Sequence, residues 1–142
     1  LPDIGLAAEA LDLLRRDSMI VQTVIGVRSL EQARFVRAAS PDSVILGFLK
    51  DTESFRAFFD LGGDIARLWE EDCRPELLQA ARCGDHPVWV TAGRRPAGDR
   101  PGDIDLPRLD RLFDCRIDGI LVNDPAQALR ARQALEARKG MR

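Results

Sequence analysis

The residues best suited to chemistry lie at the carboxyl ends of the strands that we expect from the sequence, or directly after them. They lie at positions 22–23, 50–51, 69–72, 91–95 and 123–124. In α/β proteins with parallel strands, ligands bind at the carboxyl ends of the strands, which share one edge of the sheet. Six of these residues are candidates to line a substrate site: Gln22, Thr23, Trp69, Glu70, Thr91 and Asn123.

Three consecutive carboxylates follow Trp69 in the segment WEED, residues 69–72. Carboxylates at the end of a strand could hold a metal ion or act as a general base. They could also form the acidic first turn of the next helix, which the helix dipole favours, and this is our main interpretation. Trp69 could line the mouth of a site or pack against its neighbours, and the sequence leaves both open.

Arginines are concentrated in the segment RRPAGDRPGD, residues 94–103. A guanidinium group can bind a phosphate through two parallel hydrogen bonds, so Arg94 and Arg95 are weak phosphate-binding candidates. A loop rich in Gly, Pro and Asp, with no apolar residue to anchor it, is also typical of a solvated connector. We expect a connector and keep phosphate binding as the alternative.

The single histidine, His86, precedes Pro87 at the start of an expected strand. Strand starts lie opposite the site edge of a barrel, so we expect His86 on the surface. A mechanism that needs two histidines cannot be housed in this chain alone. The three cysteines, Cys73, Cys83 and Cys115, contain no C-x-x-C pair, and we expect reduced thiols rather than metal ligands.

Length and composition are those of one globular domain. The chain has 142 residues, 45% hydrophobic and 31% charged, and we predict a single unit over residues 1–142. A formal net charge of −2 gives no reason to expect nucleic acid or an anionic membrane as a partner. No apolar run approaches the roughly 20 residues that span a bilayer, and no signal peptide is evident, so we expect a cytoplasmic location.

Short apolar runs alternate with amphipathic segments along the chain. We expect strands at 19–27, 43–49, 64–69, 87–91 and 119–123, and helices at 5–16, 29–39, 52–61, 74–83, 106–115 and 125–138. Ser29 with Gln32 is a capping-box pattern, and Asp124 before Pro125 is a natural helix N-cap.

This alternation predicts an α/β fold with a parallel sheet covered by helices. Two architectures fit: a small doubly wound sheet, or part of a (β/α)8 TIM barrel with about five βα units. No Gly-x-Gly-x-x-Gly or Walker-type loop follows a strand, which disfavours a nucleotide-binding sheet.

Four segments, in this order along the chain, resemble the C-terminal half of the glycerophosphodiester phosphodiesterase family. They are IVQTVIG (20–26), SPDSVILGFL (40–49), ELLQAARCGDHPVWVTAG (76–93) and RIDGILVNDPAQAL (116–129). The last is similar to the closing strand of that family, and the third to the helix and strand that lead to its Trp-Thr-Val-Asn motif. Three positions depart from the pattern: Val90 replaces the aromatic residue, Gly93 the asparagine and Asn123 the aspartate.

The resemblance implies the C-terminal part of a TIM barrel of about 250 residues. The His-Arg-Gly motif, the Glu-x-Asp metal pair and the His-Asp motif of the family would lie in an N-terminal part. We therefore expect no catalytic or metal-binding residue in this chain. The resemblance also implies that the full enzyme uses a divalent metal, Mg²⁺ or Ca²⁺, and two histidines to hydrolyse a small-molecule phosphodiester to glycerol 3-phosphate and an alcohol.

Because the chain begins with Leu1 and is too short for a full barrel, we expect a piece of a larger protein. Such a piece should be inactive alone and should self-associate through exposed strand edges. Two alternatives stay open. One is a non-catalytic α/β binding or assembly module with a complete small sheet; the other is an unrelated phosphate-binding barrel fragment that uses Arg94, Arg95 and Arg100.

Overall fold

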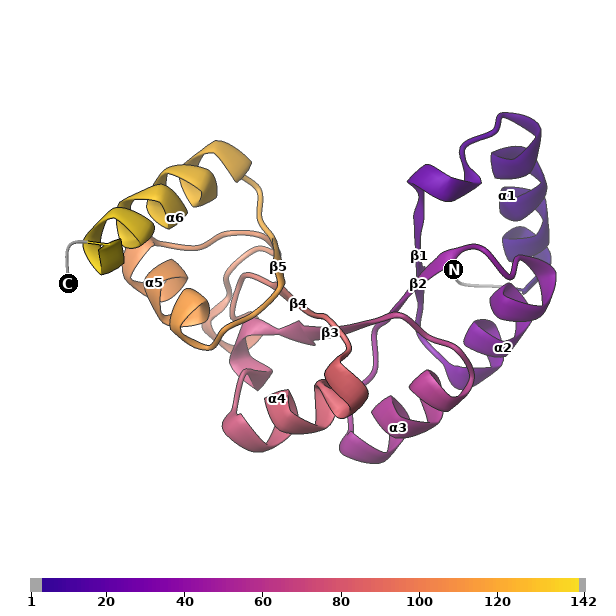
Figure 1. Cartoon of the computed structure of the whole chain (residues 1–142), viewed down its shortest axis with the longest axis horizontal. Helices are drawn as coiled ribbons and strands as arrows, with labels where there is room; N and C mark the ends of the chain where they lie inside the picture. The colour runs from indigo at the N-terminus through magenta and orange to yellow at the C-terminus, as the bar shows by residue number, and fades with distance from the viewer. Residues whose placement is uncertain (1–3, 141–142) are drawn as a thin grey trace.

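The computed structural model describes residues 4–140 (Figure 1). Its strands are β1 (Val24–Val27), β2 (Val44–Gly47), β3 (Ile65–Trp69), β4 (Val88–Thr91) and β5 (Gly119–Leu121). Its α-helices are α1 (Ile4–Arg16), α2 (Leu30–Ala39), α3 (Thr52–Asp60), α4 (Pro75–Ala81), α5 (Leu106–Asp114) and α6 (Pro125–Gly140). Within residues 4–140 there are also four 3-10 turns: η1 (Ile20–Gln22), η2 (Glu70–Asp72), η3 (Cys83–Asp85) and η4 (Arg95–Ala97).

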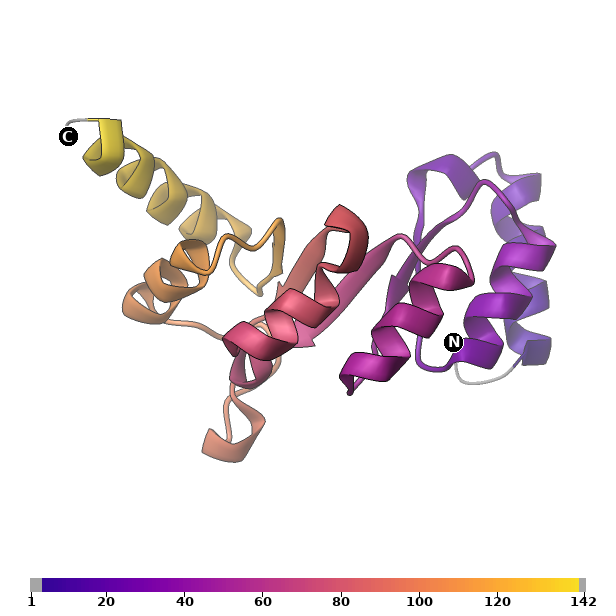
Figure 2. The ribbon, with the colours of Figure 1, turned by 60° about the horizontal axis from the view of Figure 1, so that its bottom comes forward.

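The strands are parallel and lie in the order β1-β2-β3-β4-β5. Right-handed crossovers between sequential neighbours place every connecting helix on the same face of the sheet. Figure 1 shows this arrangement: the helices follow the convex side of a curved sheet, and the strands line the concave side. Figure 2 shows α3 and α4 in front of the strands that they connect.

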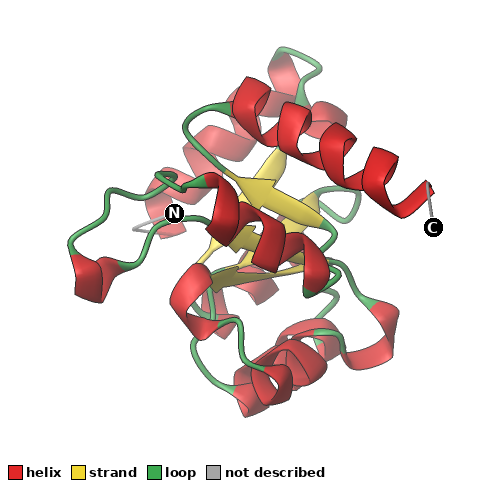
Figure 3. Cartoon of the chain, turned by 90° about the vertical axis from the view of Figure 1, so that its left-hand side faces the viewer, coloured by secondary structure: helices red, strands yellow, loops and turns green. Residues whose placement is uncertain are grey.

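This topology confirms the α/β prediction and decides between the two architectures. A doubly wound sheet reverses its strand order and carries helices on both faces. Here the order never reverses, and in Figure 1 the concave face carries no helix within residues 4–140. Figure 3 shows the chain from the side on which α5 and α6 lie. The described chain therefore has the winding of an open portion of a (β/α) barrel.

The core lies between the sheet and its helices. Successive side chains of a strand point to opposite faces, so alternate residues reach the helices. On this side, Val27 of β1 and Val88 and Val90 of β4 are fully buried. Phe55 and Phe58, which lie on the sheet side of α3, are also fully buried and belong to the two larger apolar clusters of the core.

The first strand is shorter than the sequence predicts. Ser18 adopts a left-handed conformation (φ 57°) at the end of α1, and the chain then makes the turn η1 before it reaches the sheet. The hydroxyl of Thr23 donates to the carbonyl of Met19 at 2.9 Å within this turn. The apolar, β-branched composition of residues 19–23 concealed a turn whose hydrogen bonds are local.

Helix starts follow the predicted capping patterns. The backbone amide of Gln32 donates to Ser29 Oγ at 3.2 Å. The side-chain oxygen of Gln32 accepts from the backbone amide of Arg28, whereas in a standard capping box it would accept from the amide of Ser29. Asp124 caps α6 through the amide of Gln127 at 2.9 Å. Between residues 4 and 140, no helix has both the length and the apolar character needed to cross a membrane.

Candidate functional site at the carboxyl edge of the sheet

The carboxyl ends of β3, β4 and β5 bring four of the six predicted substrate-lining residues to one edge. Trp69 ends β3 and pairs in register with Thr91 at the end of β4. Glu70 follows Trp69 directly, and Asn123 lies two residues beyond β5. The structure thus gathers Trp69, Glu70, Thr91 and Asn123 into one region, which we call the rim.

Gln22 and Thr23 are not part of the rim. Both precede β1, so they lie at the amino edge of the sheet, and Gln22 is exposed. Their predicted position at the end of a strand is wrong because β1 starts only at Val24. The residues that follow β1 at the rim are Arg28 and Ser29.

Glu70 is held by a buried ion pair with Arg108, in the first turn of α5. Its two carboxylate oxygens accept from Arg108 Nε at 2.6 Å and from Nη2 at 2.5 Å. The two side chains are 8% and 9% exposed, so this bidentate pair is shielded from water. The amide of Gly93 donates to the same carboxylate at 2.9 Å. Glu70 therefore connects the end of β3 to the loop after β4 and to α5.

Arg108 also binds the loop between β4 and α5. Its Nη2 lies 2.9 Å from Asp99 Oδ2, and the side-chain hydrogen bonds to Glu70 raise the pKa of Arg108. The amide of Arg94 donates to Asp99, which is the main reason that the pKa of Asp99 is lowered. Arg108 is thus a cation bonded to two carboxylates from separate segments. A continuous network joins β3, the loop and α5.

The loop of residues 94–103 is anchored on the rim, so a purely solvated connector is the wrong description. The amide of Gly102 donates to the carbonyl of Ala92 at 2.7 Å, and the amide of Asn123 donates to the carbonyl of Gly102 at 2.9 Å. The side chain of Asn123 donates to the carbonyl of Pro101 and to Asp103 Oδ1 at 2.9 and 2.7 Å. Backbone bonds and the side chain of Asn123 provide the anchor, and the composition of the loop does not reveal them.

Gly102→Ala is expected to destabilise the protein by about 2–3 kcal/mol. Gly102 has a φ of +89°, and an added Cβ would lie 2.3 Å from Asn123 Oδ1 and 2.9 Å from the Asn123 backbone nitrogen. Gly98→Ala is a matched control, because Gly98 also has a positive φ (+78°) but nothing within 4 Å of an added Cβ. It should cost only about 1 kcal/mol. Equal losses in urea unfolding would show that the loop does not pack on Asn123.

The concave face carries a buried arginine that the sequence pattern did not single out. Arg67, in β3, is 3% exposed, and its Nε donates to Thr91 Oγ1 at 2.7 Å. Its guanidinium carbon lies 3.5 Å from the ring centroid of Trp69 and 4.9 Å from that of Phe48. Trp69 and Thr91 therefore pack on a buried cation. The sequence feature that could have pointed to Arg67 is a charged residue inside the otherwise apolar strand segment DIARLW.

Trp89 lies on the same concave face. It pairs in register with Arg67, and Val88 and Val90 on either side of it face the helices. A Cβ on Gly119 of the neighbouring strand would lie 2.6 Å from Trp89 Cδ1, so the indole packs directly over β5. The indole fills the space left by the absent side chain of Gly119, which identifies Trp89 as a packing residue.

Of the two weak phosphate-binding candidates, Arg94 and Arg95, the structure describes the side chain of Arg94 only. The exposed side chain of Arg94 lies 3.5 Å from Asp99 Oδ2. Arg95 begins the turn η4, and its side chain is outside the described part of the structure. Asp99 is therefore an internal acceptor for Arg94.

His86 lies at the amino end of β4, as predicted, away from the rim. It is half-buried rather than fully on the surface, because its ring stacks on Phe59 with centroids 3.8 Å apart and planes 3° from parallel. This contact with α3 gives His86 a packing role.

The described residues do not supply a ligand set for a divalent metal. No group of three or more His, Cys, Asp or Glu side chains in the part of the chain that the structure describes could hold an ion. Around the rim, Glu70 binds Arg108, Asp103 accepts from Asn123, and Asp51 caps α3 by accepting from Ser54. These carboxylates serve internal bonds, so they do not form a metal-ligand set at the rim.

Cys73 is expected to react slowly with iodoacetamide. Burial, followed by the neighbouring Cys115, raises the pKa of the Cys73 thiol to about 12. At pH 8 the native thiol should be alkylated roughly a thousandfold more slowly than the same residue in urea, because the thiolate is the nucleophile. The contribution of this pKa shift to the stability of the folded protein is fully present below the ordinary pKa of a thiol, and it is lost as the pH rises towards 12. Peptide mass spectrometry measures both rates, and equal rates would contradict the burial.

Sequence comparison finds no match to a family model and none to a curated protein. Comparison with solved structures finds a protein from Silicibacter pomeroyi DSS-3 named as a "Putative glycerophosphoryl diester phosphodiesterase". The two structures agree with a TM-score of 0.73 at 17% sequence identity. The likeness is one of fold. It covers 93% of this chain but only 44% of that one, so this chain spans less than half the length of its structural neighbour.

Proposed function

We propose that this chain is the C-terminal part of a glycerophosphodiester phosphodiesterase-like hydrolase, a phosphoric diester hydrolase. The observation that carries the proposal is the agreement in fold over 93% of the chain with a protein given that name. The strand order supports it, because five sequential parallel strands with helices on one face correspond to five consecutive units of an eight-stranded barrel. The four motifs described above, in the order the family has them, support the same assignment.

In the complete enzyme, the chain would form one wall of the site. Trp69 and Thr91 would lie on this wall, held by Arg67, and the Glu70–Arg108 pair would keep the loop of residues 94–103 against the rim. The substrate would be a small-molecule glycerophosphodiester, which the enzyme would cleave with water into glycerol 3-phosphate and an alcohol. By the family resemblance, Mg²⁺ or Ca²⁺ and the two proton-transferring histidines would be held by the N-terminal part.

The isolated 142-residue chain is therefore expected to be inactive. Purified protein should release no glycerol 3-phosphate from glycerophosphocholine or glycerophosphoethanolamine, with Mg²⁺ or Ca²⁺ added or with EDTA. Isothermal titration should detect no binding of either metal at micromolar concentration. Metal-dependent turnover by a stable monomer of this chain would overturn the proposal.

A further inference from the structure

The concave face of the sheet holds a positive charge between aromatic rings. Arg67 is only 3% exposed, although this face carries no helix within residues 4–140. Its guanidinium carbon lies 3.5 Å from the ring centroid of Trp69 and 4.9 Å from that of Phe48. A cation within about 6 Å of a ring centroid is attracted by the negative charge on the ring face. The two rings therefore form a site for a cation, and the arginine of the chain itself fills it.

The guanidinium group lies closer to the rim than the position of Arg67 in its strand indicates. Its Nε donates to Thr91 Oγ1 at 2.7 Å, and Thr91 pairs in register with Trp69, two residues further along β3. The side chain of Arg67 therefore bends towards the ends of β3 and β4. Its charge lies directly below the edge at which parallel α/β folds bind their ligands.

Neighbouring strands fix this arrangement. Thr91, which is 8% exposed, holds the guanidinium group from β4. Phe48, which directly follows β2, lies over β1, because a Cβ on Gly26 would be 2.6 Å from Phe48 Cε2. Arg67 is thus held by a hydrogen bond on one side and by packed rings on the other, so its charge has a defined place on the concave face.

We infer that Arg67 is a specificity-determining residue, which makes the concave face reject quaternary ammonium groups and accept uncharged or anionic groups. Proteins bind quaternary ammonium groups against aromatic faces such as those of Trp69 and Phe48. Here such a group would meet a guanidinium already stacked on the same rings, and two like charges a few ångströms apart in a shielded site repel each other. A hydroxyl group meets no such repulsion, and an anion is attracted.

One consequence rests on the proposed function. A glycerophosphodiester has an anionic glycerol phosphate part and an alcohol part, and in glycerophosphocholine the alcohol carries a quaternary ammonium group. The concave face of this chain would then contact the glycerol phosphate part, and the choline would point away from Trp69. Glycerophosphocholine would still be a substrate, because its cationic end would avoid Arg67.

Two ligands of nearly the same shape test the inference on the isolated chain. They are choline and 3,3-dimethylbutan-1-ol, in which carbon replaces the charged nitrogen. The chain has two tryptophans, so the indole N–H signal of Trp69 can be followed by ¹H–¹⁵N NMR at constant ionic strength, with Trp89→Phe to assign it. In the wild type, choline should bind at Trp69 no more tightly than the uncharged alcohol.

Substitutions of Arg67 separate its charge from its packing. Arg67→Met keeps a long side chain but removes the charge, so the ratio of the two affinities should shift towards choline by about tenfold or more. Arg67→Lys keeps a positive charge and should retain the ratio of the wild type. A purely structural role for Arg67 would leave this ratio unchanged in both variants.

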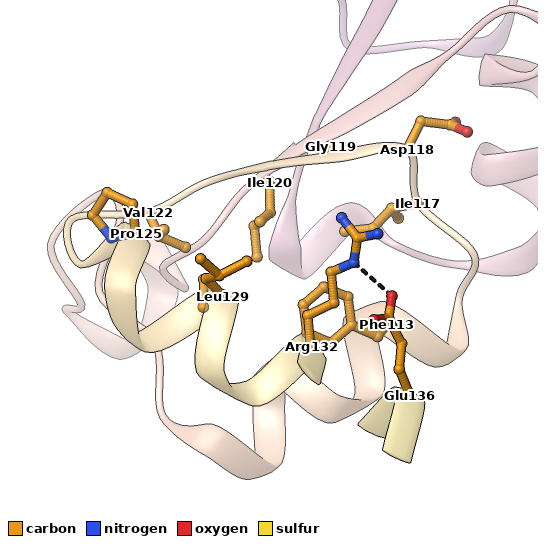
Figure 4. Close-up of a pocket in the computed structure, with 11 residues that line it drawn as sticks. Phe113, Ile117, Asp118, Gly119, Ile120, Val122, Pro125, Leu129, Arg132 and Glu136 are labelled. Atoms are coloured by element: carbon orange, nitrogen blue, oxygen red, sulfur yellow. Dashed lines mark hydrogen bonds and ion pairs between the residues drawn. The ribbon is translucent and has the colours of Figure 1, made fainter. Parts of the chain in front are cut away.

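An apolar groove on the other face of the sheet could also take up an apolar ligand (Figure 4). It lies between β5 and α6, and Ile120, Val122 and Leu129 are among the residues that line it. Neither tryptophan belongs to the described lining. Binding in this groove should leave the Trp69 signal in place, so a shift of that signal reports the concave face.

Two outcomes would overturn the inference: tighter binding of choline than of the alcohol by the wild type, or a folded Arg67→Met variant without a preference for choline. If Arg67→Met does not fold, Arg67→Gln carries the same expectation, because its side-chain amide can still donate to Thr91. The readout is binding to the isolated chain. A failure to hydrolyse glycerophosphodiesters would therefore refute the proposed function alone, and a wild type that prefers choline would refute this inference alone.

Discussion

Arg108→Met is expected to lower the free energy of unfolding by about 3–5 kcal/mol, the usual cost of removing one partner from a buried ion pair. Without Arg108, the Glu70 carboxylate would keep one donor, the amide of Gly93, and its charge would be uncompensated at a site where the side chain is 9% exposed in the intact protein. The loop of residues 94–103 would also lose the contact between Arg108 and Asp99. Urea unfolding followed by circular dichroism measures the loss.

Two further variants test whether the loss of stability comes from the uncompensated charge of Glu70. Glu70→Gln combined with Arg108→Met removes the buried charge while an amide oxygen can still accept from Gly93, so the double variant should recover part of the lost stability. Arg132→Met breaks an ion pair with Glu136 in which both side chains are more than 60% exposed, and it should change stability by no more than about 0.5 kcal/mol. Equal losses for Arg108→Met and Arg132→Met would contradict the shielding of the Glu70–Arg108 pair.

Completion of the barrel is expected to produce the largest functional change, from no turnover to turnover. The isolated chain lacks a metal-ligand cluster in its described residues, and its rim carboxylates are engaged by arginine, asparagine and backbone partners. If the proposed function holds, a chimera that places the uncovered part of the Silicibacter pomeroyi protein before this chain will contain the metal-binding and proton-transferring groups. Its turnover should be on the order of 1 s⁻¹ or more, within the common range for enzymes.

The order and type of most elements could be predicted from the sequence. Apolar runs such as SVILGFL and PVWVT differ from the amphipathic helices in period, and caps such as Ser29 and Asp124 mark where helices begin. The start of β1 could not be predicted, because residues 19–23 have the composition of a strand but close a local turn at Thr23.

The contacts of the rim depend on long-range pairing. Glu70 and Arg108 are 38 positions apart, and neither WEED nor the first turn of α5 indicates the other. The anchoring of the loop by Asn123 spans 20 and 22 positions. The position of Glu70 and Asn123 at the carboxyl edge of the sheet could be predicted from the sequence, because strand ends are local features. Their partners could not be assigned from the sequence, because they are set by how β3, β5 and α5 are brought together.

The most direct test of the proposed function is release of glycerol 3-phosphate by the chimera, compared with the isolated chain. The two proteins would be incubated with glycerophosphocholine and Mg²⁺ or Ca²⁺, and the product would be measured by ³¹P NMR. We expect release by the chimera that EDTA abolishes, and none by the isolated chain. Equal release by both proteins, or a folded, closed chimera that releases none with either metal, would contradict the proposed function.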